Sequence, residues 1–267
     1  MSQWIKKLVF AKPDRDKDFG LKNIVSFSNV GKDIPVWQTC NYTGNEDILV
    51  KIFYSHGNGE DLYSVNKYLT DLIDEFLNNM EIDDKQIAFA LWAWEYPFYG
   101  ESLKPFEALS EKGIKKDAIT SYKAFHNTKF TTNTKTRQIE IVMGYSLGCF
   151  PTLYLSTKFS TIDACLLFAP FKNISSAIGA LGGVSSYFFT DTFSNYKLLP
   201  KAICKVYTIQ SKDDDAISYR GNSEVFKEFS TKYLALEKKK HTWFTTSEGL
   251  LLMQKTLIEI IELILLK

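Results

Sequence analysis

Residues 144–148 read Gly-Tyr-Ser-Leu-Gly and directly follow an apolar run at 139–143. This spacing puts a serine where a buried strand is expected to end and a helix to begin. A serine on such a sharp turn points its hydroxyl out of the sheet, and flanking glycines let the backbone turn without a Cβ clash. Amide N–H groups that open the next helix face the same point. The pattern therefore predicts that Ser146 is a nucleophile.

A serine hydroxyl attacks well only when a base takes its proton, and that base is usually a histidine oriented by a carboxylate. The chain has three histidines. His56 opens a glycine turn, and we interpret it as a structural residue that orients its loop. His126 lies in a polar helix-to-loop region and is expected to be exposed. His241 follows the last short strand and precedes the final helix, so it is the predicted base.

The carboxylate candidates are three successive residues, Asp213, Asp214 and Asp215, which follow the strand expected at 203–209. Residue types alone leave all three open as the partner of the histidine. Cys149, one helical step beyond the serine, is expected inside the helix and is discounted as an alternative nucleophile.

Acyl transfer also needs an oxyanion hole, in which amide N–H groups stabilise the charge that develops on the carbonyl oxygen. The N–H of Leu147, directly after the serine, is one expected donor. The other should come from the loop after an early central strand, where His56 is followed by Gly57, Asn58 and Gly59. Because glycines flank it, the Asn58 N–H is our candidate. No metal or organic cofactor is required by this chemistry.

Strands and helices alternate along the chain, which predicts an α/β fold with a mainly parallel sheet and helices on both faces. A single domain over residues 1–267 is expected. The expected strands span 5–10, 25–30, 35–39, 48–54, 87–94, 139–143, 164–168, 203–209 and 233–236, and the expected helices 62–79, 117–126, 149–157, 224–229 and 249–266. The connection at 172–200 has weak periodicity and is the candidate for a small lid.

Charge and composition exclude several classes. The 267 residues include 32 basic and 31 acidic side chains, so no basic excess indicates nucleic-acid binding. The four cysteines are scattered without metal-ligand spacing. The first residues lack the apolar core of a signal peptide, and no uncharged stretch of about 20 apolar residues indicates a membrane span. We therefore expect a cytoplasmic monomer. Three lysines at 238–240 offer a peripheral contact with anionic membrane, although a solvated face is the favoured interpretation.

Several segments together resemble serine hydrolases of the α/β-hydrolase superfamily. They are 53–62, 94–102, 144–148, 191–196 and 209–214, read with the order serine, aspartate, histidine on alternating strands and helices. The chain is most similar to cytosolic α/β-hydrolase-domain proteins of the protein-depalmitoylase type, and more distantly to monoacylglycerol lipases. The family's acid falls on Asp214 and its histidine on His241. The family's glycine in the acid turn is Ser211 here.

The resemblance implies an α/β-hydrolase fold and a hydrolase that cleaves acyl esters or thioesters through a covalent acyl-enzyme. Expected substrates are small acyl esters and acylated proteins or lipids. Two alternatives stay open: a lipid hydrolase like the monoacylglycerol lipases, and a non-catalytic interaction protein of the same fold. Larger caps are typical of enzymes that cleave peptides or carbon–carbon bonds, and the short connection at 172–200 leaves little room for one.

Overall fold

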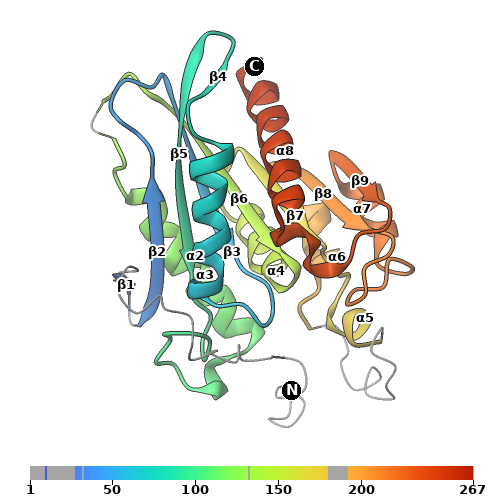
Figure 1. Ribbon diagram of the computed structural model, residues 1–267. Coiled ribbons are helices and arrows are strands. Elements are labelled where there is room, and N and C mark those ends of the chain that lie inside the picture. Colours follow the sequence, from blue (N-terminus) through green and yellow to red (C-terminus); the bar gives the residue numbers. More distant parts are fainter. Residues whose placement is uncertain (1–9, 11–27, 32, 132, 180–191, 267) are drawn as a thin grey trace.

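Apolar runs of the sequence form the strands of one twisted sheet (Figure 1). The computed structural model describes residues 10, 28–31, 33–131, 133–179 and 192–266, and within these residues nine strands join the sheet. They are β1 (Ser28–Val30), β2 (Ile34–Cys40), β3 (Ile48–Ser55), β4 (Met80–Ile82), β5 (Lys85–Trp94), β6 (Arg137–Tyr145), β7 (Ala164–Phe168), β8 (Lys205–Ser211) and β9 (Lys232–Leu236). Every residue of β3 is buried, as expected of a strand covered on both faces.

The strands are ordered β1-β2-β5-β3-β6-β7-β8-β9, and β4 pairs with β5. From β5 to β9 all neighbours are parallel, whereas β1, β2 and β4 run antiparallel to their partners. Parallel strands end at a common edge. The register pairs Ser55 at the end of β3 with Gly144 near the end of β6, so the loops after these strands meet at that edge.

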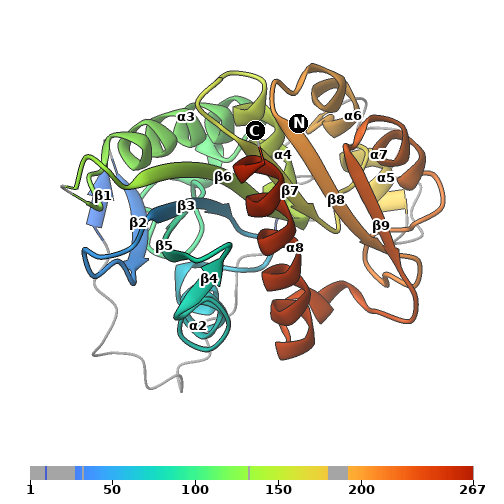
Figure 2. The same cartoon turned by 90° about the horizontal axis from the view of Figure 1, so that it is seen from above.

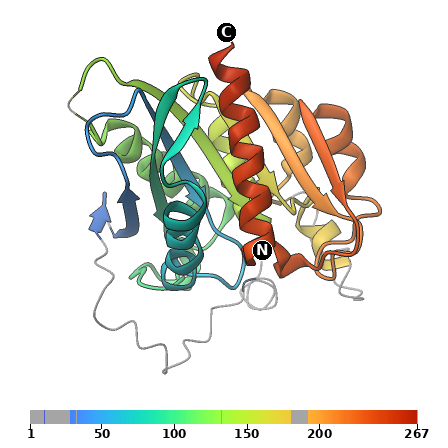
Figure 3. The same ribbon diagram turned by 45° about the horizontal axis from the view of Figure 1, so that its top comes forward.

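Helices cover both faces of the sheet, which is visible from above in Figure 2. One face carries α2 (Leu62–Asp71), the π-helical turn η1 (Leu72–Phe76) and α8 (Ser247–Leu265). The other carries α3 (Glu111–Asn127), α4 (Cys149–Ser156) and α7 (Ser223–Phe229). Figure 3 shows α2 and α8 on the near side of the sheet. The remaining helices within the described ranges are α5 (Ile174–Gly179) and α6 (Asn195–Leu198), with 3₁₀ turns η2 (Phe106–Ala108), η3 (Ser146–Gly148), η5 (Leu199–Lys201) and η6 (His241–Thr245).

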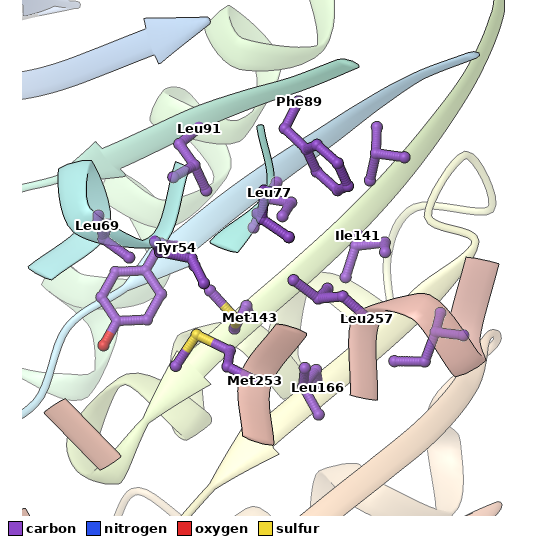
Figure 4. Close-up of a cluster of buried hydrophobic side chains, with 14 of the residues drawn as sticks. Tyr54, Leu69, Leu77, Phe89, Leu91, Ile141, Met143, Leu166, Met253 and Leu257 are labelled. Carbon is purple, nitrogen blue, oxygen red and sulfur yellow. The ribbon is translucent and has the colours of Figure 1, made fainter. Parts of the chain in front are cut away.

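Two apolar layers hold these helices on the sheet. Under α2 and α8, side chains of alternate sheet positions meet the apolar stripes of the helices (Figure 4). This layer includes Tyr54, Leu69, Leu77, Phe89, Leu91, Ile141, Met143, Leu166, Met253 and Leu257. Under α3, α4 and α7 the intervening sheet positions, such as Phe53, Val142 and Leu167, form the second layer. Full burial of one such side chain stabilises the fold by about 1.5–3 kcal/mol.

Most expected elements are present, with shifted ends. The helix expected at 62–79 is present as α2 continued by the π-helical turn η1, but it ends at Phe76, and β4 then begins at Met80. Asn79, with φ 51°, and the pair Asp83 and Asp84, with φ 50° and 60°, flank β4, so left-handed residues bound the short hairpin that follows the helix.

Some expectations fall on residues outside the described part of the chain. Of the strand expected at 5–10 only Phe10 is described, where its ring packs on Phe193 at 5.6 Å. Of the lid segment 172–200, residues 172–179 and 192–200 are described, and the Ile174 N–H donates to Thr192 O at 3.2 Å. Among the helices of the described residues, none is long and apolar enough to cross a membrane.

Candidate active site

Ser146 lies on the tight turn between β6 and α4. Its φ is 50°, in the left-handed region that non-glycine residues rarely adopt, and it is almost fully buried. The two glycines of the pentapeptide are needed for close approach. A Cβ on Gly144 would lie 2.5 Å from Thr152 Oγ1 in α4, and one on Gly148 would overlap Ser55 O. The glycines therefore let the helix pack on its own strand and on the end of β3, which fixes where the serine points.

The structure brings Ser146, His241 and Asp214 together from three separate loops. His241 Nε2 lies 3.0 Å from Ser146 Oγ, and His241 Nδ1 lies 2.8 Å from Asp214 Oδ2. Because a carboxylate only accepts, Nδ1 carries the proton in the neutral ring. Nε2 then presents its lone pair to the serine O–H. The imidazole is 14% exposed and the aspartate side chain 3%, so the site is partly open on the histidine side.

Asp214 is held in this orientation by its own loop. Its Oδ1 accepts the N–H groups of Ala216 at 2.9 Å and Ile217 at 2.7 Å, while Oδ2 faces the imidazole. An aspartate that binds the backbone two and three residues onward forms a local turn of its own. The carboxylate is therefore oriented before any substrate arrives.

The end of β3 and the loop after it, residues 56–59, lie directly against the serine turn. Besides Ser55 O, a Cβ on Gly148 would come within 2.7 Å of His56 O. Asn58 follows in this loop, and its Oδ1 accepts the Tyr99 hydroxyl at 2.6 Å. Leu147, the other expected donor, is buried in η3 beside the serine. Both residues predicted for the oxyanion hole thus belong to neighbouring loops at the same edge of the sheet.

No protein-family model and no curated protein sequence matches the chain. Alpha/beta hydrolase domain-containing protein 10 from mouse superposes with a TM-score of 0.58 at 15% identity, over 90% of this chain and 99% of that one. The chain has the α/β-hydrolase fold.

Two further structures show how varied the proteins of this fold are. The esterase Pf2001 from Pyrococcus furiosus gives a TM-score of 0.62 at 9% identity, over 89% of this chain and 91% of that one. A puromycin-hydrolyzing peptidase from Mycobacterium tuberculosis gives 0.60 at 14% identity over 88% of this chain, which spans 39% of the length of that one. Because one fold carries several chemistries, the α/β-hydrolase fold alone does not name the reaction.

The three successive aspartates of the acid loop have three different partners. Asp213 Oδ2 accepts the Lys238 N–H at 2.6 Å, Asp214 takes the imidazole, and Asp215 Oδ1 accepts the His241 N–H at 3.0 Å. The last bond lowers the pKa of Asp215. Ser211 occupies the position where the resembling family has glycine. Its hydroxyl donates to Lys239 O and accepts the Asp213 N–H at 3.2 Å. The acid loop and the histidine loop are thus bonded residue by residue.

Tyr145, inside the pentapeptide, contacts the histidine loop as well. Its ring stacks on the His241 imidazole with centroids 5.2 Å apart, and its hydroxyl donates to His241 O at 3.0 Å. Burial raises the pKa of Tyr145, so this hydroxyl stays a donor. The residue before the serine therefore holds the backbone and one ring face of the histidine.

His56 is fully buried and holds its own loop, in agreement with the structural role expected from the sequence. Nδ1 lies 2.9 Å from Gly57 O and Nε2 lies 2.9 Å from Glu95 Oε1. Both partners only accept, so both ring nitrogens must donate and the ring is cationic. Burial lowers the pKa of His56, but the hydrogen bond and charge of Glu95 outweigh it and raise the pKa above the ordinary value.

His126 and Cys149, which the sequence also singled out, bind groups outside the series Ser146, His241 and Asp214. His126 is 42% exposed, as expected, although it also pairs with Glu140 Oε1 at 2.9 Å on β6. The Cys149 thiol donates to Gly144 O and Phe168 O at 3.2 and 3.3 Å, and burial raises its pKa, so it is a poor nucleophile. Within the described residues no group of three or more His, Cys, Asp and Glu side chains could hold a metal ion.

Sequence reasoning missed the contacts that Tyr145, Asp215 and Glu95 make at the carboxyl edge of the sheet. A signal existed for Glu95, because it comes directly after the apolar run 87–94 and so had to lie at the carboxyl edge of a parallel sheet. Tyr145 is inside the motif itself. Asp215 was considered only as an alternative partner of the imidazole, whereas it binds the backbone of the same histidine.

Proposed function

We propose that the chain is a serine hydrolase that cleaves carboxylic esters or thioesters of acyl chains through a covalent acyl-enzyme. The observation that carries the proposal is the unbroken series of hydrogen bonds from Ser146 Oγ through the His241 ring to Asp214. Serine, imidazole and carboxylate in this order are the recurring arrangement for acyl transfer. The esterase among the similar structures agrees with it, at the level of the fold.

In the first half of the reaction, Ser146 Oγ attacks the acyl carbonyl carbon while its proton passes to His241 Nε2. Asp214 keeps the imidazole in the required tautomer and stabilises the cation that forms. The N–H groups of Leu147 and Asn58 bind the oxyanion. When the tetrahedral intermediate collapses, the bond to the leaving oxygen or sulfur breaks, and the Nε2 proton goes to that leaving group.

In the second half, water takes the place of the leaving group. His241 Nε2 accepts a proton from this water as its oxygen attacks the acyl carbon. The same proton then returns to Ser146 Oγ as the acid leaves. The cycle uses only groups of this chain and water, and the His241 imidazole, which exchanges protons with both the leaving group and the water, is 14% exposed. Acylated proteins and monoacyl lipids are therefore both candidate substrates of this mechanism.

The test is a fluorophosphonate probe followed by a panel of substrates. Wild-type protein is expected to react with the probe and to hydrolyse medium-chain p-nitrophenyl esters and acyl thioesters. Ser146→Ala should lose both, with kcat lower by roughly 10⁴–10⁶-fold. Comparison of acyl-thioester, p-nitrophenyl ester and monoacylglycerol rates then assigns the leaving group. Properly folded wild-type protein that ignores the probe and every substrate would point instead to the non-catalytic alternative.

A further inference from the structure

The turn that carries Asn58 is held by side chains on both sides of Gly57. A peptide unit is planar, so fixing its carbonyl also fixes the direction of the N–H that follows. Gly57 O, which shares a plane with the Asn58 N–H, accepts His56 Nδ1–H at 2.9 Å and the Glu60 N–H at 3.4 Å. His56 O, which shares a plane with the Gly57 N–H, accepts the Tyr96 hydroxyl at 2.6 Å.

The Gly57 N–H itself donates to a side-chain carboxylate. Glu60 Oε2 accepts it at 2.6 Å, which is short for an amide donor and typical of a charge-assisted bond. Glu60 thus contacts the turn twice, through its carboxylate on the Gly57 N–H and through its own N–H on Gly57 O. One residue closes both ends of the four-residue turn that contains Asn58.

Glu60 is in turn anchored to the core. Its Oε1 accepts the Tyr68 hydroxyl of α2 at 3.2 Å, and the Tyr68 and Tyr54 hydroxyls lie 2.8 Å apart. Since Tyr68 donates to the carboxylate, Tyr54 of β3 donates to Tyr68. Both tyrosine side chains are buried between α2 and the sheet. The carboxylate therefore connects the turn to a rigid part of the fold.

The turn also contacts the histidine side of the site. A Cβ on Gly57 would lie 2.8 Å from the Tyr145 ring and 3.0 Å from Glu60 Oε2. The same Tyr145 ring stacks on His241. If Gly57 moved, it would push on the residue that supports the proposed base. The position of Gly57 thus affects both the direction of the Asn58 N–H and the Tyr145 ring that packs on His241.

We infer that Glu60 is a positioning residue that locks the oxyanion turn in place for catalysis by Ser146. The inference rests on the proposed function, because it assigns Glu60 a task in that reaction. Glu60 touches neither the serine nor a reacting atom in this arrangement. It acts through Gly57, whose amide it holds and whose carbonyl sets the direction of the Asn58 N–H.

The kinetic test compares two substitutions of Glu60. Glu60→Ala removes the acceptor of the Gly57 N–H, and we expect kcat for a medium-chain p-nitrophenyl ester to fall roughly 10–100-fold with KM within about threefold, since loss of one whole oxyanion donor costs about 10²–10³-fold. Glu60→Gln keeps an acceptor oxygen, so kcat should recover to within about fivefold of wild type. The matched control is Glu46→Gln. Glu46 accepts N–H groups of Thr43, Gly44 and Asn45 in a turn after β2, and its loss should leave kcat unchanged.

A trifluoromethyl ketone separates positioning from general damage to the fold. Ser146 Oγ adds to the carbonyl carbon of this inhibitor, and the resulting oxyanion occupies the proposed oxyanion hole. The affinity of the inhibitor therefore measures the contacts made in the transition state. In Glu60→Ala its Ki should rise by the same factor by which kcat/KM falls. A purely structural role would instead lower the melting temperature and leave the Ki of the folded fraction unchanged, which would overturn the inference.

An activity-independent readout is the Gly57 amide in protein labelled with ¹⁵N-glycine. Burial raises the pKa of Glu60 above the usual glutamate value. The Gly57 amide proton should therefore shift with pH along a titration whose midpoint lies above the usual glutamate pKa, and Glu60→Gln should abolish that shift. If the chemical shift of the Gly57 amide proton does not change with pH in wild-type protein, the inference that Glu60 holds this turn is contradicted.

The activity measurements and the glycine amide titration together distinguish failure of the inference from failure of the proposed function. If wild type is active and Glu60→Ala matches it in kcat and in inhibitor affinity, only the role of Glu60 is wrong. If wild type is inactive toward every substrate and the probe, the proposed function fails and with it the catalytic role of Glu60. The glycine titration then still decides whether the carboxylate holds the turn.

Discussion

Two histidines of the carboxyl edge are each paired with a carboxylate at nearly the same distance, yet their surroundings give them opposite properties. His241 lies 2.8 Å from Asp214 and His56 lies 2.9 Å from Glu95. The second ring nitrogen makes the difference. That of His241 faces a serine hydroxyl, which can donate, whereas that of His56 faces a carbonyl, which only accepts. One ring is therefore free to take a proton, and the other must keep both of its own.

Exposure sharpens the contrast. The His56 and Glu95 side chains are both fully buried, whereas the His241 ring remains partly open. Glu95 also accepts the Leu62 N–H at the start of α2 at 3.1 Å, so this pair connects the end of β5, the loop that contains Asn58 and a helix. A buried ion pair of this kind is costly to break. The role of a histidine–carboxylate pair therefore depends on the group that the second ring nitrogen contacts. Replacing the carboxylate of each pair by the corresponding amide tests this.

Among the carboxylate-to-amide substitutions, the largest effect is expected from Asp214→Asn. An asparagine amide can donate to Nδ1, which moves the ring proton to Nε2 and removes the lone pair that accepts the Ser146 proton. The expected loss in kcat at neutral pH is roughly 10⁴-fold. Steady-state hydrolysis of a p-nitrophenyl ester measures it. The melting temperature should change by only a few degrees, because the loop bonds to Ala216 and Ile217 can be kept by the amide oxygen.

Glu95→Gln, the matched change in the second pair, should act mainly on stability. It leaves the buried cationic ring without its counter-charge, and we expect the free energy of unfolding to fall by about 3 kcal/mol. Urea denaturation at pH 7 measures it. Activity of the folded fraction should fall far less than in Asp214→Asn. If the two variants lost activity equally and stability equally, the division of roles between the pairs would be wrong.

The same pair gives the wild-type protein a pH-dependent stability of known sign. The pKa of His56 is raised in the folded chain, so the folded state holds this proton more tightly than the unfolded chain does. The stabilisation is complete below the ordinary histidine pKa of about 6.5 and is lost as pH rises through the folded value. Unfolding experiments from pH 6 upward should show the decline in wild type and a flatter profile in Glu95→Gln.

Much of the candidate site could be located in the sequence because its motifs are local. The two glycines of the Gly-x-Ser-x-Gly pattern mark close backbone contacts within a few residues of the serine. The predicted base could be chosen because the chain has only three histidines. Choosing Asp214 among three aspartates required the family resemblance, because the choice depends on which carboxylate reaches across to another loop. That reach is a property of the folded chain.

Other features could not be predicted for the same reason. His56 and Glu95 are 39 positions apart, and no local pattern joins them. The helix was expected to reach residue 79 because Phe76 and Leu77 continue its apolar pattern with no strong breaker. The helical turn η1 ends at Phe76, and Asn79 adopts a left-handed conformation just before β4. Periodicity describes which face is apolar, while the π turn and β4 depend on packing against β5 and α8.

The smallest expected effect comes from Asp215→Asn. Asp215 accepts the His241 N–H, and an asparagine oxygen can do the same, so the substitution removes only the negative charge beside the proposed base. Because that hydrogen bond lowers the pKa of Asp215, the charge is present throughout the pH range of the reaction. We expect kcat to fall about two- to threefold at low salt, and less at high salt, where exposed charges are screened.

Asp213→Asn is the control, because Asp213 binds the Lys238 N–H in the same pair of loops without contacting His241. Its kcat should match wild type at every salt concentration. A fall in kcat for both variants would mean that the loop contacts as a group, and not the charge next to the imidazole, matter for turnover. An effect confined to Asp215→Asn would instead add a second difference between the two histidines. His241 would then depend on one carboxylate at its ring and on another at its backbone N–H. The charge of His56, by contrast, is balanced by Glu95 at the ring alone.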